Sequence, residues 1–477
     1  MEKILEFLRK WLIIESDPSI LVKIGFAISI SVGVLFTVLY LYQFFYIFLA
    51  CVHKPLVYPE TDQSKRYAVL IAARNEEKVI PELLKSILGQ TYPADKIHIY
   101  VVADNCTDDT AGVARALGAT VYERQNKTLV GKGYALEFLL NRIREEDADR
   151  GFRAYDGYFV FDADNVLRAN YIAEMDKAFS AGHRVVTSYR NSKNYGKTWI
   201  SAGYALWFLR EARHLNNPRS ILHTSAAISG TGFLVSSDII ERNGGWRHFL
   251  LTEDIEFTVD CVLHGDKVGY CHKAELFDEQ PETFRQSWRQ RKRWAKGFFQ
   301  VFHRYGGGLV RRSLMFRWSC FDMSMNIMPA FLLSIVQLLT VFGLFTANLI
   351  VYHEASLTLL NCLLAFFEFG YCLIFIMGTF AMITEWRHIH CNKFKAILLL
   401  LTFPVFMMTY IPISISALFS HVEWTPIAHI YNVDTTAIEN QDITAVEEAK
   451  PAEEPQPENK EPQPAGEEPQ PERKTDD

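Results

Sequence analysis

The sequence lacks the closely spaced cysteines that mark a zinc site or a disulfide framework. Its eight cysteines form no C-x-x-C pair, and several lie within apolar runs. Its fourteen histidines are scattered along the chain, so neither histidine-based nor Ser-His-Asp catalysis finds support. We therefore expect the aqueous part of the protein to be reduced and intracellular, with its chemistry carried by other residue types.

Excess charge of either sign is scarce outside one segment. The formal net charge is only −6, and the last forty residues hold thirteen Asp or Glu against four Lys or Arg. The rest of the chain is therefore slightly basic, which excludes a strongly acidic domain and gives no charge-based reason to expect nucleic-acid binding. Glu-Pro-Gln-Pro recurs from residues 454, 461 and 468, so residues 432–477 are predicted to be a disordered, acidic, proline-rich tail.

Long apolar runs, by contrast, are abundant. Four of them exceed about 20 predominantly apolar residues, the length that spans a bilayer as a helix. Because buried core helices are seldom this long and uniform, we predict four transmembrane helices, at residues 20–53, 323–352, 355–384 and 396–422. The first run is too long for the apolar part of a signal peptide. Ahead of it, residues 1–16 place apolar side chains at helical spacing and predict an interfacial amphipathic helix.

Basic residues between the apolar runs predict the orientation in the membrane. Lys65 and Arg66 follow the first run and several arginines precede the second, so residues 65–280 are predicted to be a cytosolic domain. If all four spans cross, both termini lie outside and the chain is a multi-pass protein of the plasma membrane. Glu368 lies in the third run and is costly in lipid, so a place on a translocation path and a structural hydrogen bond both stay open for it.

Within residues 65–280, short apolar runs alternate with amphipathic helical patterns. The β-branched runs predict strands at 67–71, 97–102, 120–122 and 157–161, and the segments between them predict helices at 77–88, 108–117 and 132–143. Such alternation is typical of an open, mostly parallel α/β sheet, in which ligands bind beyond the carboxyl ends of the strands. The predicted fold class is therefore α/β, with the sheet domain inserted between transmembrane α-helices.

Acidic residues stand where two of these strands end. Asp104 ends the second strand, and Asp162-Ala-Asp164 ends the fourth. Asp162 and Asp164 project to one face of a strand, so we expect a divalent cation, Mg²⁺ or Mn²⁺, to join carboxylates that would otherwise repel each other. Asp108 and Asp109, one turn into a helix, are interpreted as capping residues instead.

Several short motifs follow one another in a fixed order. They are Ala73-Arg-Asn-Glu76, Asp104, Gly131-Lys-Gly-Tyr-Ala-Leu136, Asp162-Ala-Asp164, Gly230-Thr-Gly232, Thr252-Glu-Asp254 and Gln290-Arg-Lys-Arg-Trp294. Each is weak alone, but their order, with Q-x-x-R-W directly before the membrane, resembles the membrane-embedded family-two glycosyltransferases. These include the chitin, hyaluronan, poly-N-acetylglucosamine and cellulose synthases. The resemblance covers residues 67–306 and implies a GT-A-like (Rossmann-like) fold and a hexosyltransferase activity with a UDP-sugar donor.

The resemblance also implies roles for individual residues. Nucleotide-sugar binding falls to Ala73, Arg74, Asn75, Glu76, Asp104, Lys132 and Asp162. Asp164, assisted by Asp162, binds the Mg²⁺ or Mn²⁺ cofactor. Asp254 is the catalytic base, with Glu253 beside it. Contacts to the acceptor and the diphosphate fall to Thr252, Gln290, Arg293, Trp294, Gly230, Thr231 and Gly232.

Two aromatic helical segments admit more than one interpretation. Residues 281–322, which hold Q-x-x-R-W, are predicted to form basic amphipathic helices at the membrane interface, with residues 290, 293 and 294 on one helix face. A second helix, at 199–208, places Trp199, Gly203 and Trp207 along one face, and core packing is favoured over acceptor binding there.

Three functions fit this pattern. The leading one is an inverting, metal-dependent transferase that uses UDP-GlcNAc or UDP-Glc to extend a β-linked polysaccharide, processively and with coupled export. The second transfers one sugar to a lipid or oligosaccharide acceptor, and a distant third is a membrane receptor that senses nucleotide sugars. The expected partners are the donor, a growing polysaccharide or lipid-linked acceptor, and membrane lipid. Because four spans are few for a self-sufficient pore, a homo-oligomer or an accessory export protein is expected as well.

Overall fold

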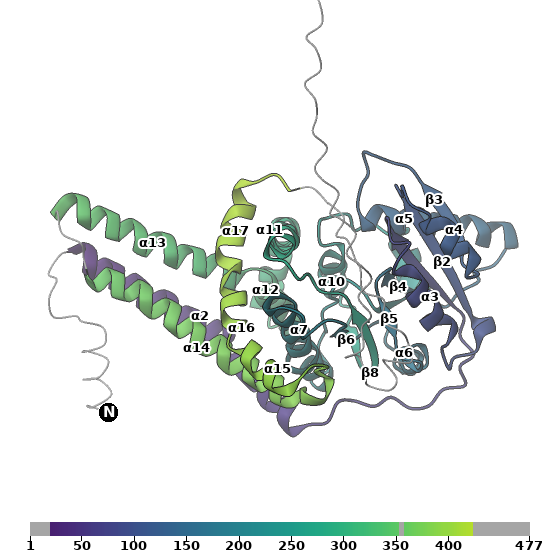
Figure 1. The fold of residues 1–477 in the computed structure, drawn as a ribbon, viewed down its shortest axis with the longest axis horizontal. Helices are drawn as coiled ribbons and strands as arrows, with labels where there is room; N and C mark the ends of the chain where they lie inside the picture. The colour runs from purple at the N-terminus through teal and green to yellow at the C-terminus, as the bar shows by residue number, and fades with distance from the viewer. Residues whose placement is uncertain (1–19, 353–356, 423–477) are drawn as a thin grey trace, which may run out of the picture.

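The computed structural model describes residues 20–352 and 357–422, and shows an α/β body from which long helices project to one side (Figure 1). The predicted interfacial helix at 1–16 and the predicted tail at 432–477 lie outside the described residues. The elements are α2 (Ile20–Val52), β1 (Tyr67–Ala73), α3 (Ile80–Leu88), η1 (Ala94–Lys96), β2 (Ile97–Asp104), α4 (Thr110–Ala116), β3 (Thr120–Arg124), α5 (Lys132–Arg150), β4 (Gly157–Asp162), β5 (Val166–Leu167), α6 (Tyr171–Ser180), β6 (Val185–Ser192), α7 (Trp199–Arg210), η2 (Glu211–Asn216), α8 (Asn217–Ile221), β7 (Phe233–Ser236), α9 (Ser237–Arg242), α10 (Glu253–His264), β8 (Val268–Asp278), α11 (Phe284–Leu314), α12 (Trp318–Ile327), α13 (Pro329–Tyr352), α14 (Leu357–Thr384), η3 (Trp386–His388), α15 (Lys393–Leu400), α16 (Phe403–Met408) and α17 (Tyr410–Phe419).

The four predicted strands form the parallel half of the sheet, in the order β3-β2-β1-β4. In the register of these strands, Ala73 lies opposite Ala103 and Ala72 lies opposite Asp162. Asp104 and Asp162 therefore flank the end of β1 at the same edge of the sheet. This arrangement follows from parallel pairing, which brings the carboxyl ends of neighbouring strands together.

The second half of the sheet is mixed and was not predicted. β7 pairs antiparallel with both β4 and β6, β8 runs parallel to β6, and the short β5 closes the sheet against β8. Two antiparallel steps make β6 and β8 parallel to β4, so Asp278, the last residue of β8, ends at the same edge as Asp162. The α/β, GT-A-like fold class is confirmed, with a sheet twice as wide as the sequence indicated.

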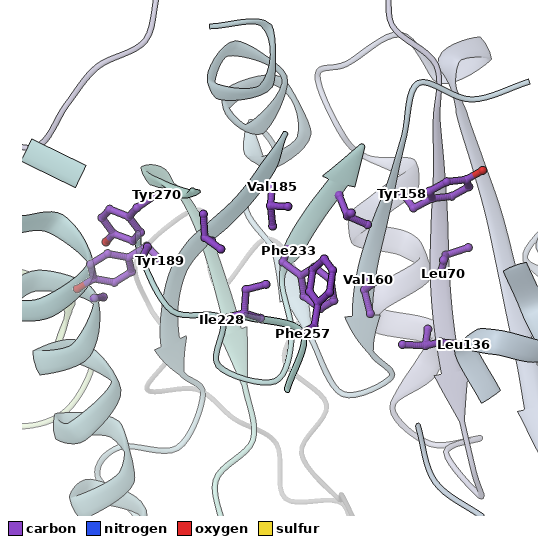
Figure 2. Close-up of a cluster of buried hydrophobic side chains, with 14 of the residues drawn as sticks. Leu70, Leu136, Tyr158, Val160, Val185, Tyr189, Ile228, Phe233, Phe257 and Tyr270 are labelled. Atoms are coloured by element: carbon purple, nitrogen blue, oxygen red, sulfur yellow. The ribbon is translucent and has the colours of Figure 1, made fainter. Parts of the chain in front are cut away.

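Helices cover both faces of the sheet with separate apolar layers. One face packs on α3, α4 and α6, and the other packs on α5, α7, α9 and α10. Figure 2 shows the second layer, in which Leu136, Phe233 and Phe257 meet side chains of β1 and β4. Full burial of such side chains stabilises the fold by about 1.5–3 kcal/mol each. α10 ends at Gly265, whose φ of +86° favours glycine.

Three helices of the described residues, α2, α13 and α14, are long and apolar enough to cross a membrane. They run alongside one another away from the α/β body (Figure 1). The run predicted as one helix at 323–352 is divided, however. Residues up to Ile327 belong to α12, which contributes the buried Met323 and Cys320 to a core cluster with α10 and α11. Pro329 then begins α13, a position where its missing N–H costs nothing.

The run predicted as a single helix at 396–422 is instead broken into α15, α16 and α17, with a bend of 44° between α15 and the rest. Pro404, at the start of α16, cannot donate the backbone hydrogen bond that would continue α15. The broken helices pack on the catalytic body: a Cβ at Gly203 of α7 would come within 2.4 Å of the Phe406 ring. Residues 396–419 therefore serve partly as a cover for α7.

A buried ion pair joins α2 to the body. Arg219 of α8 donates from Nε to Oδ2 of Asp322 at 2.7 Å and from Nη2 to Oδ1 at 2.8 Å. The hydroxyls of Tyr42 and Tyr46, both on α2, donate to the same carboxylate at 3.0 Å each. Because every carboxylate oxygen has two donors, this buried charge is well compensated, and it fixes α2 against α8 and α12.

Candidate active site

One cavity of about 820 Å³ begins at the carboxyl edge of the sheet and continues between α2, α13, α14 and α17. It brings together most of the residues that the motifs predicted: Ala73, Arg74, Glu76, Asp104, Lys132, Asp162, Asp164, Gly230, Thr252, Glu253, Asp254, Gln290, Arg293 and Trp294. Motifs separated by more than 200 residues thus line a single space. Their individual roles stay predictions.

Three predicted residues are not among the residues that line the cavity. Asn75 has a φ of +58° and accepts the Thr107 backbone N–H at 2.7 Å, which ties two loops together. Thr231 accepts the Asp162 backbone N–H at 2.9 Å. A Cβ at Gly232 would come within 1.9 Å of Leu276, so only glycine fits there. Thr231 and Gly232 therefore shape the backbone of the site, whereas Asn75 is exposed and joins two loops beside it.

Asp104, at the predicted nucleoside end, already has a protein partner. Its carboxylate accepts Nη1 of Arg124 at 2.5 Å, and both side chains are buried. Arg124 also donates to the Leu129 carbonyl at 2.7 Å, which holds the loop before α5. The sequence did not single out Arg124. The ion pair gives Asp104 a fixed orientation beside the cavity.

Carboxylates accumulate at the ends of β4 and β8. Lys132, at the start of α5, contacts the Asp162 carboxylate and donates to the Gly230 carbonyl at 2.8 Å. Asp164 accepts the Glu279 backbone N–H at 3.0 Å. Asp278 lies close by, paired with Arg190. The pKa of Asp278 is raised to about 6, chiefly by burial and also by the charges of Asp164 and Asp162, against the lowering effect of Arg190.

This arrangement fits a divalent cation. Asp162, Asp164 and Asp278 lie together at this edge, and the charges of Asp164 and Asp162 add to the effect of burial in raising the pKa of Asp278. Among the described residues, no group of three or more His, Cys, Asp or Glu side chains could hold a metal ion by itself. Oxygen ligands and an incomplete shell suit Mg²⁺ or Mn²⁺ completed by a diphosphate.

The predicted base lies in the first turn of α10. Oδ2 of Asp254 accepts the Gly230 backbone N–H at 2.6 Å, and the side chain lines the cavity. Burial raises the pKa of Asp254 and raises that of Glu253 to about 7, while the positive charges of Lys132 and Arg293 lower both. A carboxylate whose pKa is moved toward neutrality is suited to accept a proton from a hydroxyl.

Q-x-x-R-W lies on α11, which crosses α10 closely. A Cβ at Gly297 would come within 2.5 Å of Thr252, so glycine sets the separation of the two helices. Trp294 packs edge-on against Tyr204 and Phe208 of α7, with ring centroids 5.7 and 6.3 Å away. Gln290 Oε1 and Thr252 Oγ1 are buried without a hydrogen-bond partner in the described part of the chain. Both are therefore available to a ligand.

The structure adds residues that the motifs missed and shows where two residues of open role lie. Arg190 stacks on Phe208 at 3.8 Å and lines the cavity with Asp278. Asp278 could have been found, because it ends a strand as Asp104 and Asp162 do. In the aromatic helix, Gly203 packs on Phe406 while Trp207 lines the cavity. Glu368 is exposed and outside the cavity lining.

Comparisons with known proteins agree with this geometry. Residues 65–297 match the family model described as Glycosyltransferase like family 2. The β-monoglucosyldiacylglycerol synthase of Synechocystis sp. is 24% identical over 258 residues, 53% of this chain and 50% of that protein. The poly-β-1,6-N-acetyl-D-glucosamine synthase of Staphylococcus epidermidis is 24% identical over 255 residues, 52% of this chain and 58% of that protein.

Among solved structures, the mannosyltransferase PcManGT of Pyrobaculum calidifontis, in complex with GDP-Man and Mn²⁺, aligns with a TM-score of 0.51. It shares 16% sequence identity, and the alignment covers 76% of this chain and 98% of that one, which shows a shared fold. Residues 65–297 match this glycosyltransferase family model, and this match together with the named relatives supports the prediction of a hexosyltransferase. The chain spans about half the length of the curated relatives it matches.

Proposed function

We propose that the protein is an inverting, divalent-metal-dependent hexosyltransferase that uses UDP-GlcNAc or UDP-Glc to extend a β-linked polysaccharide at the plasma membrane. The observation that carries this proposal is the single cavity that runs from the carboxylates at the sheet edge into the apolar helices. A product formed at Asp254 has a route into the helices, which supports processive growth coupled to export. The poly-N-acetylglucosamine synthase among the relatives supports the same product class.

The chemistry assigned to the chain's own groups is a single displacement. Asp254 accepts the proton of the acceptor hydroxyl, whose oxygen forms a bond to C1 of the donor sugar as the bond from C1 to the diphosphate breaks. The configuration at C1 inverts, and the proton stays on Asp254 until it returns to solvent. Asp162 and Asp164 would hold Mg²⁺ or Mn²⁺, which when bound neutralises charge on the diphosphate. The Mn²⁺ named with PcManGT supports this cofactor class.

A second candidate is the transfer of one sugar to a lipid. Two observations favour it: the membrane part of the cavity is lined mainly by aliphatic, aromatic and methionine side chains, and one relative is named as a glucosyldiacylglycerol synthase. In either case the catalytic domain is proposed to face the cytosol, with α2, α13 and α14 in the membrane. A homo-oligomer or an export partner would complete a pore for the polysaccharide.

The test is incubation of the full chain, purified in detergent, with labelled UDP-GlcNAc or UDP-Glc and Mg²⁺ or Mn²⁺. Polymer of increasing length supports the polysaccharide synthase. Single additions to added lipid support the second candidate. Binding of UDP-sugar without turnover under every condition contradicts both and favours a sensor of nucleotide sugars.

A further inference from the structure

The membrane side of the cavity holds a buried arginine with unused hydrogen-bond donors. Arg210, the last residue of α7, is only 3% exposed and lines the cavity. Its Nη2 donates to Gln43 Oε1 of α2 at 2.6 Å and lies 3.8 Å from Met377 Sδ. Nε and Nη1 have no partner among the residues that the structure describes. Buried guanidinium donors are nearly always satisfied, so these two indicate a place for the oxygens of a ligand.

The charge of Arg210 is also poorly compensated. Burial lowers its pKa to about 10, which leaves the guanidinium charged at neutral pH. It stacks over the Trp207 ring at 4.9 Å. Among the neighbouring charges Glu211 raises the pKa of Arg210 most, but its carboxylate accepts the Ser229 hydroxyl at 2.5 Å. A buried cation without a bonded anion is costly, so an anionic ligand would be bound here.

Beyond Arg210 the cavity becomes apolar. The side chains that line it from α2 and α14 are chiefly aliphatic, aromatic or sulfur-containing: Ile30, Val32, Phe36, Phe44, Ile47, Cys362, Phe366, Phe369, Leu373, Ile374 and Met377. Such a lining suits an alkyl chain. α2 and α14 lie alongside each other as they leave the body (Figure 1).

The anion site is close to the predicted base. Glu211, the residue after Arg210, contacts Ser229, and the next residue, Gly230, donates its backbone N–H to Asp254 at 2.6 Å. Arg210, Glu211, Ser229 and Asp254 line the same cavity. One ligand can therefore reach the apolar helices, the arginine and the base together.

We infer that Arg210 binds the phosphate of an amphiphilic acceptor, a lipid whose tail lies between α2 and α14 and whose acceptor hydroxyl lies toward Asp254. The inference rests on the second candidate of the proposed function, the transfer of a sugar to a lipid, because it names the acceptor class of that reaction. The phosphate forms no new bond to the protein. The guanidinium orients the lipid and contributes its charge, so Arg210 is a positioning residue.

The test is a binding measurement on the full chain purified in detergent. The probes are a polyprenyl phosphate and the polyprenol of the same length, which differ only in the phosphate. Wild type is compared with Arg210→Gln, Arg210→Lys and the matched control Arg213→Gln. Arg213 lies three residues further along and also contacts α2, through the Ala50 carbonyl at 2.7 Å, but it is outside the cavity lining. Tryptophan fluorescence and native mass spectrometry report binding, and thermal unfolding confirms that each variant is folded.

The expected result is that wild type and Arg213→Gln bind the phosphate form at least tenfold more tightly than the alcohol. Arg210→Gln loses this preference and Arg210→Lys keeps part of it. Equal binding of the two probes by wild type, or a preference that survives in Arg210→Gln, overturns the inference. Displacement by millimolar inorganic phosphate or by an acidic oligosaccharide as readily as by the lipid also overturns it, because the site would then take a free anion or a polymer. Failure of the proposed function has another signature, which is an intact phosphate preference without transfer from any UDP-sugar.

Discussion

Replacing Asp254 with Asn removes the proposed base while keeping the shape of the site. The Asn side chain has nearly the same size, and its carbonyl oxygen can still accept the Gly230 backbone N–H that Oδ2 of Asp254 accepts at 2.6 Å. The variant loses the ability to take a proton, and one negative charge near Lys132 is removed. Because the base is not assigned to donor binding, the affinity for UDP should stay within about threefold of wild type, roughly 0.6 kcal/mol.

The expected loss of rate follows from the role. A positioned general base contributes a factor of about 10² to 10⁴, so kcat should fall by that factor, equivalent to about 3–5 kcal/mol in the activation barrier. The assay measures transfer from labelled UDP-sugar alongside UDP affinity by calorimetry. Asp260→Asn is the matched control, because Asp260 lies on the same helix, bonds His248 at 3.2 Å and is outside the cavity lining. A kcat above a tenth of wild type in Asp254→Asn would refute the assignment.

Three further predictions concern neighbouring residues. Glu253 has a pKa raised from 4.5 to about 7, so the stability gained from its protonated form is complete below pH 4.5 and is lost as the pH rises through about 7. At about 1.36 kcal/mol per pKa unit, the change in the free energy of unfolding is at most about 3 kcal/mol. The Tm of Glu253→Gln should therefore vary less between pH 5 and 8 than that of wild type. Parallel curves of Tm against pH for the two proteins would contradict this. Trp294→Ala should keep UDP-sugar hydrolysis and lose acceptor transfer by at least tenfold, with Trp294→Phe partly restored, and equal loss of both reactions would argue against an acceptor contact. Gly203→Ala should lower the free energy of unfolding by about 1–3 kcal/mol, and the Tm with it, because the added Cβ would lie 2.4 Å from a ring of α16. Gly343→Ala is the control, since nothing lies within 4 Å of its Cβ; equal Tm values for the two variants would contradict the packing argument.

The parallel half of the fold could be predicted from the sequence because each strand is a continuous apolar run. β1, with the sequence Tyr-Ala-Val-Leu-Ile-Ala-Ala, is buried along nearly its whole length. β8 escaped prediction because His272 and Lys273 interrupt it. Its register with β6 shifts between Ser188 and Tyr189, where Lys273 reaches the surface and His272 stays half-buried. Hydrophobic periodicity identifies a strand only when the strand is buried in the same way along its whole length.

The same limit applies to the site. Asp162 and Asp254 stand in short motifs with local signals, so the sequence could select them. Arg190 and Arg210 matter through what they face, and their surroundings come from β8 and α2, which lie far away in the chain. No local sequence pattern marks a buried guanidinium such as that of Arg210, whose Nε and Nη1 have no partner among the described residues. The broken fourth helix was likewise hidden, because its composition is as apolar as that of an unbroken span.

The Arg219–Asp322 pair has a mechanical consequence. Tyr42 and Tyr46, in the C-terminal half of α2, donate hydrogen bonds to the Asp322 carboxylate of this pair. Arg210 donates a hydrogen bond to Gln43 in the same turn of α2. These hydrogen bonds attach α2 to the catalytic body over one turn of the helix. Helices change their tilt when the bilayer becomes thicker or thinner. In the proposed membrane arrangement, a change of tilt in α2 would move the wall of the cavity, so we expect the reaction rate to depend on membrane thickness.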